Sequence, residues 1–287
     1  MRIDAHHHVW DLAVRNQDWL AGEVMAPTSR TFVMSDMEPA LDRSHIDYTV
    51  LVQTQPLLAE TPEFLDIAQE HAKVAAVVGW LDMGEDDVTE ALEGHLSHPE
   101  AKRLVAIRDM VQGKEDPRWL AQDRVIRNLQ RLGERGIAYD LLTIPFQLPA
   151  AIEAVRAAPE TRFVLDHLSK PNIAEGQFDD WARDMRELAQ LPNVWVKISG
   201  MVTEAKWDDW SVETFRPYVE LCAEAFGPDR LMFGSDWPVC LLGGEYHDVV
   251  DIVEQLTSSW SDAEQAAIFD SDWAMVGRAG DVPEPGD

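Results

Sequence analysis

Eight short runs rich in Val, Ile and Leu alternate along this chain with longer amphipathic stretches. The amphipathic stretches, residues 60–72 and 123–136 among them, carry apolar residues at three- and four-residue spacing, which is typical of α-helices. The short runs have the length of buried strands and cover residues 1–9, Tyr48–Gln55, Val74–Asp82, Leu104–Val111, Ile137–Thr143, Arg162–Ser169, Val194–Gly200 and Arg230–Pro238. Alternating strands and helices predict a parallel sheet in an α/β protein.

Eight strand–helix units within 287 residues predict a closed (β/α)8 barrel, a TIM barrel, as a single domain. An open doubly wound sheet would place a glycine-rich phosphate loop after its first strand, whereas this chain has three histidines there. We assign residues 1–276 to the barrel domain and residues 277–287 to a flexible tail. Residues 11–36 are expected to form a long loop over the barrel mouth, and residues 199–210 a second long loop.

The net charge of the chain argues against some classes of binding partner. Acidic residues outnumber basic ones by 52 to 24, for a formal net charge of −28, which disfavours nucleic acids and anionic membrane surfaces. Two cysteines without a CxxC spacing suit a reducing compartment, and no run has the pattern of a signal peptide or the length of a membrane span. We expect a cytoplasmic protein that acts on a small molecule. Whether it forms a homo-oligomer is left open by the sequence.

The predicted strands end in polar residues. In a TIM barrel the active site lies at the carboxyl ends of the strands, and buried strands avoid charged groups that serve no purpose. The polar and aromatic residues at or just after the run ends are His6, His7, His8, Gln53, Gln55, Trp80, Asp82, Arg108, Asp140, His167, Lys170, Lys197, Ser199 and Asp236. This set predicts a catalytic barrel mouth.

The three consecutive histidines are expected to do different jobs. Side chains alternate faces along a strand, and residues two apart lie on one face about 6.6 Å apart, so His6 and His8 face the barrel interior while His7 faces the helices. Taken singly, the HxH pair could be polar surface, His167 a core histidine and Asp236 a helix N-cap. Together on the strand ends, they predict a site for one divalent ion, zinc first, with a position open for water.

Seven stretches carry a resemblance to a known family: "DAHHHVW", "VQTQP", "DPRWL", "DLLTIPFQLP", "FVLDHLSKP", "KISGMVTEA" and "RLMFGSDWPVC". From residue 1 to about residue 245 the chain resembles the amidohydrolase-related sugar lactonases of amidohydrolase family 2, which include L-fuconolactonases and L-rhamnono-lactonases. The resemblance implies a TIM barrel, hydrolysis of a lactone ring, and a site centred on His6, His8, His167 and Asp236.

The chain also departs from the family pattern. It has Asp109 where relatives often carry histidine, which bears on the substrate, His7 where glutamine is common, and "DSDWAMVGRAG" in place of an Asn-Ala pair followed by an aromatic residue. The fifth run ends in "YDLLT" without a lysine that could bridge two metals, so two-metal chemistry is not expected. The family includes members that work without a metal, so the single ion could be dispensable.

The resulting hypothesis is an enzyme that opens the lactone ring of a sugar acid, an aldonolactone such as L-fucono- or L-rhamnono-lactone. Asp236 would take a proton from the attacking water, and His167, with the ion, would polarise the carbonyl. Five tryptophans lie near predicted loops, where their indole faces suit sugar rings: Trp10, Trp19, Trp80, Trp207 and Trp237. The predicted substrate-binding residues are Arg108, Lys197, Gln53, Trp80, Lys170 and Trp10.

Other interpretations of the same residues stay open. Arg108 and Lys197 could instead form ion pairs with Asp82, Asp109 or Asp140. The same barrel could also house a metal-dependent decarboxylase, an amide hydrolase, or a non-catalytic sugar-acid-binding protein, and the last has no need of a base such as Asp236.

Overall fold

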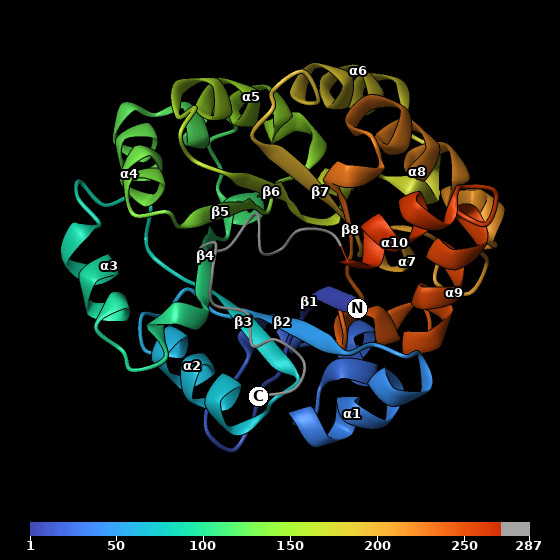
Figure 1. The fold of residues 1–287 in the computed structure, drawn as a ribbon, viewed down its shortest axis with the longest axis horizontal. Helices are drawn as coiled ribbons and strands as arrows, with labels where there is room; N and C mark the ends of the chain where they lie inside the picture. The colour runs from blue at the N-terminus through green and yellow to red at the C-terminus, as the bar shows by residue number, and fades with distance from the viewer. Residues whose placement is uncertain (271–287) are drawn as a thin grey trace.

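The computed structural model describes residues 1–270, which form a ring of strands surrounded by helices (Figure 1). The strands pair in sequence order and every pairing is parallel. They are β1 (Ile3–His7), β2 (Tyr48–Val52), β3 (Val74–Gly79), β4 (Leu104–Asp109), β5 (Ala138–Leu141), β6 (Phe163–Leu165), β7 (Val194–Ile198) and β8 (Leu231–Phe233). Each lies within a predicted run, and the predicted (β/α)8 barrel is confirmed.

The ring closes just beyond the carboxyl ends of β1 and β8. The backbone N–H of Asp236 donates to the carbonyl of His6 at 2.8 Å, and that of His8 donates to the carbonyl of Trp237 at 2.7 Å. These bonds place two of the candidate ligand segments side by side. The upper limit of the predicted barrel domain, residues 271–276, and the predicted tail lie outside the described residues.

The helices pack around the barrel (Figure 1). They are α1 (Met34–Arg43), α2 (Glu60–Glu70), α3 (Thr89–Leu96), α4 (Asp123–Glu134), α5 (Leu148–Ala157), α6 (Asp179–Leu188), α7 (Met201–Glu204), α8 (Val212–Phe226), α9 (Tyr246–Leu256) and α10 (Asp262–Asp270). None of the helices within residues 1–270 combines the length and the apolar character needed to cross a membrane.

Two apolar clusters hold the fold together. The larger joins the outer faces of the strands to the helices, and the smaller fills the barrel with residues that include Val50, Val52, Val78, Ala106, Ala138 and Val164. Side chains two residues further along a strand face the same way, so Arg108, Asp140 and Asp166 continue the inward rows begun by Ala106, Ala138 and Val164. The interior therefore changes from apolar to charged toward the carboxyl ends of the strands.

A shift in pairing register turns the first strand toward the site. Ile3 and Ala5 belong to the interior cluster, whereas Asp4 accepts a hydrogen bond at 3.0 Å from the hydroxyl of Tyr246 on α9. Strict alternation would next bring His7 inward. The register of β1 on β2 shifts between Asp4 and His7, a β-bulge-like irregularity that re-aims side chains, and the ring of His6 contacts the interior instead.

Candidate active site

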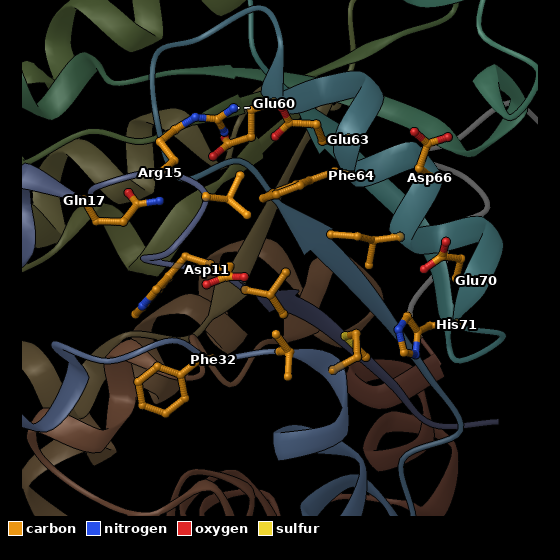
Figure 2. A pocket seen from close by; sticks show the side chains of 16 residues that line it. Asp11, Arg15, Gln17, Phe32, Glu60, Glu63, Phe64, Asp66, Glu70 and His71 are labelled. Carbon is orange, nitrogen blue, oxygen red and sulfur yellow. Dashed lines mark hydrogen bonds and ion pairs between the residues drawn. The ribbon is translucent and has the colours of Figure 1, made fainter.

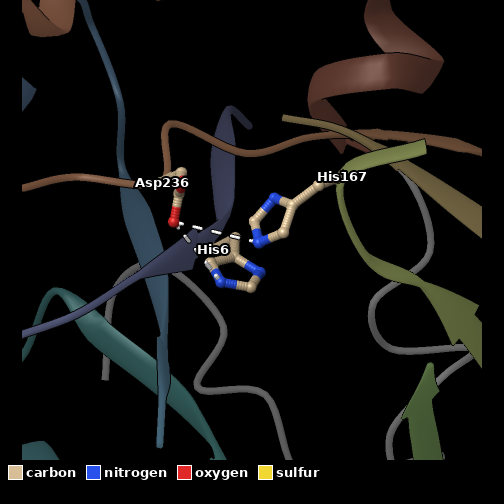
Figure 3. Close-up of side chains that lie close together, drawn as sticks. All are labelled: His6, His167 and Asp236. Carbon is tan, nitrogen blue, oxygen red and sulfur yellow. Dashed lines mark ion pairs between the residues drawn. The ribbon is translucent and has the colours of Figure 1, made fainter. Parts of the chain in front are cut away.

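Three residues from distant parts of the chain converge above the barrel interior. His6, His167 and Asp236 each present one nitrogen or oxygen atom, and these atoms lie within 4.8 Å of one another; Figure 3 shows the three side chains turned toward one another. The Nε2 atom of His8 joins them, 3.2 Å from His6 Nε2 and 3.5 Å from Asp236 Oδ1. All four predicted ligands are buried.

A left-handed turn after β6 carries His167. Four consecutive residues, His167 to Lys170, have φ between 50° and 58°, and Asp236 has φ of 57°. Such angles are costly for residues with a Cβ and persist where the surroundings enforce them, often at functional sites. The hydroxyls of Ser169 and Thr143 lie 2.8 Å apart, and the Trp181 indole donates to the carbonyl of Leu168 at 2.7 Å. These contacts hold the turn.

Gly200 gives the His167 ring its space. A Cβ at position 200 would lie 2.8 Å from the His167 ring, and Gly200 itself has φ of 63°. His167 Nδ1 lies 2.8 Å from the Ser199 hydroxyl, which leaves Nε2 facing Asp236 at 3.9 Å. Glycine is thus required at position 200 both by its backbone and by the histidine against it.

The hydrogen bonds of the histidines turn their lone pairs inward. His8 Nδ1 lies 2.7 Å from the Val52 carbonyl, which only accepts, so Nδ1 is a donor and Nε2 is the nitrogen that can offer a lone pair. His6 Nδ1 lies 3.3 Å from the carboxylate of Asp166, which orients His6 in the same way. His6 Nε2 and His8 Nε2 lie 3.8 and 3.5 Å from Asp236 Oδ1. Arg108 donates to His6 Nε2 at 3.3 Å, so a cation bound to this nitrogen would replace Arg108 as its partner. Such a donor set fits a divalent cation.

The protonation states agree with this fit. Burial lowers the pKa of His6 well below its usual value and that of His167 to about 4. Burial raises the pKa of Asp236, but His167, His8 and His6 outweigh that effect and hold it below its ordinary range. At neutral pH His6 and His167 are therefore neutral imidazoles and Asp236 is an ionised carboxylate, the forms that bind metal ions.

His7 takes no part in this cluster. Its side chain is buried, and neither ring nitrogen has a hydrogen-bond partner within residues 1–270. Burial lowers its pKa to about 3, so the ring is neutral. The predicted division of labour between His7 and its two neighbours agrees with this placement.

A layer of buried ion pairs supports the cluster from below. Asp166 lies 3.0 Å from Arg108 and 3.0 Å from Lys197, and Lys197 lies 2.5 Å from Asp140. Burial raises the pKa of Asp166, but Lys197, His6 and Arg108 lower it well below its usual value. The Arg108 guanidinium also donates to the side chain of Gln53 at 2.7 Å.

Arg108 and Lys197 are the two cations of this layer. Lys197 pairs with Asp140, as the ion-pair alternative expected, whereas the partner of Arg108 is Asp166. Asp166 is not among the predicted site residues, because in the sequence the adjacent His167 is the more evident ligand. The signal was the inward row that runs from Val164 to position 166.

A cavity of about 390 Å³ opens above the cluster. Five predicted site residues line it, namely His8, Arg108, His167, Lys170 and Asp236. Its apolar wall comes from Trp19, Met25, Met110, Leu142, Trp207, Val239 and Leu242, and its further polar groups from Thr54, Gln112, Thr203 and Glu204. The volume lies in the range of small-molecule sites.

Four predicted substrate residues do not line this cavity. Gln53 and Lys197 lie in the buried layer, where they bond to Arg108 and Asp140. The Trp80 indole faces Asp109 at 3.4 Å, so the atypical Asp109 is also a buried structural acceptor outside the cavity. Trp19 and Trp207 supply the indole faces instead. Both stand in the predicted long loops and belong to the five tryptophans expected near the loops, but nothing in the sequence selects these two from the other three.

Trp10 lines a second cavity, of about 440 Å³, between the loop after β1 and the helices α1 and α2 (Figure 2). Its indole donates to the carbonyl of Arg30 at 2.7 Å and packs edge-on against Trp19, with ring centroids 5.3 Å apart. The two tryptophans thus form part of the wall between the cavities. The second cavity is also lined by four acidic residues, as expected in a chain with a net charge of −28: Asp11, Glu63, Asp66 and Glu70.

Comparison with known proteins shows the family of this chain. The sequence model of the amidohydrolase family matches residues 3–271. The chain belongs to the amidohydrolase family. It is 38% identical over 249 residues to an L-fucono-1,5-lactonase of Burkholderia ambifaria, with 86% of this chain and 83% of that protein covered. It is 34% identical to an L-fucono-1,5-lactonase of Burkholderia multivorans, with 100% and 98% covered.

A crystal structure of an amidohydrolase from Burkholderia multivorans with bound zinc shares the fold. The two chains superpose with a TM-score of 0.88 at 32% identity, and the match covers 96% of this chain and 98% of that one. The resemblance to the amidohydrolase family that the sequence motifs predicted is thereby confirmed.

Proposed function

We propose that this amidohydrolase is a lactonase that opens the ring of a sugar-acid lactone, an aldonolactone such as L-fucono- or L-rhamnono-lactone. The observation that carries the proposal is the ionised Asp236 carboxylate, held among His6, His8 and His167 at the base of a cavity with indole walls. The L-fucono-1,5-lactonases at 38% and 34% identity support it. They do not favour a decarboxylase, an amide hydrolase or a non-catalytic binder.

In the proposed reaction Asp236 acts as the general base. It takes a proton from a water molecule as the water oxygen attacks the lactone carbonyl. The ring C–O bond then breaks, and the leaving alkoxide takes up that proton to give the open hydroxy acid. The guanidinium of Arg108, which lines the cavity 3.3 Å from His6, supplies positive charge for the oxygen that becomes negative.

The donor set of His6, His8, His167 and Asp236 would hold one divalent cation, and we propose zinc. When bound, the cation would supply Lewis-acid polarisation of the carbonyl and a lower pKa for a nearby water. The lone pairs turned toward Asp236 support this, as does the zinc in the Burkholderia multivorans structure. If the ion is dispensable, Arg108 is the fixed charge that remains. The cytoplasmic location and the oligomeric state stay predictions.

The test is a panel of aldonolactones assayed by acid release, with metal content measured on the same preparation. We expect turnover of at least one six-carbon lactone without release of carbon dioxide. Release of carbon dioxide from a carboxylated substrate would favour the decarboxylase instead. Tight binding of a sugar acid without any turnover would favour the non-catalytic barrel.

A further inference from the structure

An ion pair on the cavity wall has no role in the proposed chemistry. Lys170 Nζ lies 3.3 Å from a carboxylate oxygen of Glu204, both side chains are 24% exposed, and both line the cavity. Lys170 ends the left-handed turn that carries His167, and Glu204 ends α7. The pair therefore joins the segments that follow β6 and β7, directly beside the reacting groups.

The charges along the cavity wall cancel. The lining cations are Arg108 and Lys170, and the lining carboxylates are Glu204 and Asp236. Arg108 is paired below the cavity with Asp166 at 3.0 Å, and Lys170 is paired with Glu204. Among the described lining residues, no lysine or arginine is left without a carboxylate. A ligand carboxylate near Lys170 would meet the negative charge of Glu204.

Glu204 can also accept a hydrogen bond from a ligand, because the polar groups next to it bond to the backbone instead. The Thr203 hydroxyl donates to the Gly200 carbonyl at 2.7 Å, and the Trp207 indole N–H donates to the Thr203 carbonyl at 3.0 Å. Trp207 therefore offers the ligand mainly its apolar face. A carboxylate accepts at two oxygens, so Glu204 can accept from a ligand hydroxyl while it stays near Lys170.

We propose that Glu204 sets the specificity of this site. It neutralises Lys170 and accepts hydrogen bonds from ligand hydroxyls, so the cavity selects neutral, polyhydroxylated lactones over lactones that carry a carboxylate. This inference rests on the proposed lactonase function and deepens it by naming the charge class of the substrate.

The experiment compares the wild type with Glu204→Gln on two matched lactones. Glucono-1,4-lactone and glucaro-1,4-lactone share one ring and differ at one end, where the first has a primary alcohol and the second a carboxylate. Glutamine keeps the size of the side chain and removes its charge, which leaves Lys170 unpaired. Because hydrogen bonds to charged groups are the strong ones, we expect kcat/KM to fall roughly tenfold for the neutral lactone and to rise roughly tenfold for the anionic one.

Two further variants make the outcome specific. Glu153→Gln, on α5, removes the same charge from an exposed ion pair with Arg118. Neither residue lines the cavity, so kcat/KM should stay unchanged for both lactones. Adding Lys170→Met to Glu204→Gln should abolish the gain on the anionic lactone, because the freed cation is then absent. A preference ratio that stays within threefold of the wild type in Glu204→Gln would overturn the inference.

Failure of the lactonase proposal is distinguishable from failure of this inference. If the wild type opens no lactone, the proposed function is wrong. The charge preference is then measured by calorimetric binding of the same two lactones to Asp236→Asn and to Asp236→Asn with Glu204→Gln. Equal relative affinities in the two proteins would reject the role of Glu204, and a shift toward the anionic lactone would support it without any catalysis.

Discussion

Asp236 is the residue on which the proposed hydrolysis depends most. Asp236→Asn keeps the shape of the side chain but cannot accept a proton, and general-base catalysis contributes about 10²–10⁴ in rate. We expect kcat on the best lactone to fall at least that far while the circular dichroism spectrum stays unchanged. Metal content must be measured on the variant, since a lost ion would deepen the fall. A variant within tenfold of the wild type would place the base elsewhere, with His167 the next candidate.

The pH dependence follows from the lowered pKa values of Asp236 and His167. The pKa of Asp236 lies below its ordinary range, so the carboxylate stays ionised at every pH suitable for an assay. The pKa of His167 is lowered to about 4, so this imidazole gains a proton only as the pH falls toward that value. In metal-free protein the rate should therefore stay level from neutral pH to about pH 5 and decline below it.

Gly200 offers a test of how tightly His167 is held. In Gly200→Ala the new methyl group would lie 2.8 Å from the His167 ring, on a backbone with φ of 63°. We expect kcat to fall at least tenfold, because misplacement of a catalytic group is costly, with a loss of about 1–3 kcal/mol in stability from the backbone strain.

Gly136→Ala is the matched control for that substitution. Gly136 has a similar φ of 70°, but a Cβ there would meet no atom within 4 Å. The same backbone cost should therefore appear in urea unfolding with no change in kcat. Equal losses of activity in the two variants would show that backbone strain alone, and not the His167 contact, explains the effect.

At the scale of the strands, the pattern of apolar residues explains why the fold could be predicted from the sequence. The same pattern predicts the site only in part. Buried parallel strands are continuous apolar runs, so all eight could be found in the sequence, and their polar ends marked the barrel mouth. Alternation also predicted that His6 and His8 face inward, whereas strict alternation from Ile3 and Ala5 would bring His7 inward, and it is the register shift in β1 that turns His6 inward past Asp4. No local pattern reports such a shift.

Contacts between strands set the remaining roles. Lys170 and Lys197 look alike in the sequence, each a basic residue at a strand end. The structure places Lys197 3% exposed between Asp140 and Asp166, and Lys170 24% exposed on the cavity wall. Only their partners distinguish the two lysines, Asp140 and Asp166 for Lys197 and Glu204 for Lys170, and these partners lie far away in the sequence.

The buried layer predicts a large difference in stability between those two lysines. Lys197→Met leaves Asp140 buried without its cation, and breaking a buried ion pair in this way costs about 3–5 kcal/mol. Lys170→Met removes a partly exposed pair, which is worth about 1 kcal/mol or less. Urea unfolding of both variants measures the difference. Similar losses would mean that the charged layer does not support the barrel as described.

At the scale of the whole molecule, the four ligands of the cluster come from three segments, which lie near the beginning, the middle and the end of the chain. His6 and His8 follow from β1, His167 from β6 and Asp236 from β8, and β1 meets β8 where the barrel closes. An ion bound there would connect the first strand to the last. Its binding energy would therefore add to the stability of the closed barrel as well as to the chemistry of the site.

This coupling predicts the response to metal removal. Within residues 1–270 one group of three such ligands meets within 4.8 Å, so elemental analysis should find no more than one zinc per chain. Free zinc at about 100 times its Kd stabilises the folded state by about 2.7 kcal/mol, which corresponds to roughly 5–10 °C in Tm for a domain of this size. A chelator should lower Tm of the wild type by that amount and leave His6→Ala unchanged. Two zinc ions per chain would contradict a single-ion site. A wild-type Tm that does not respond to the chelator would show that no ion stabilises the fold. Full activity of the chelated protein at its lower Tm would show that the ion stabilises the fold and is not needed for catalysis.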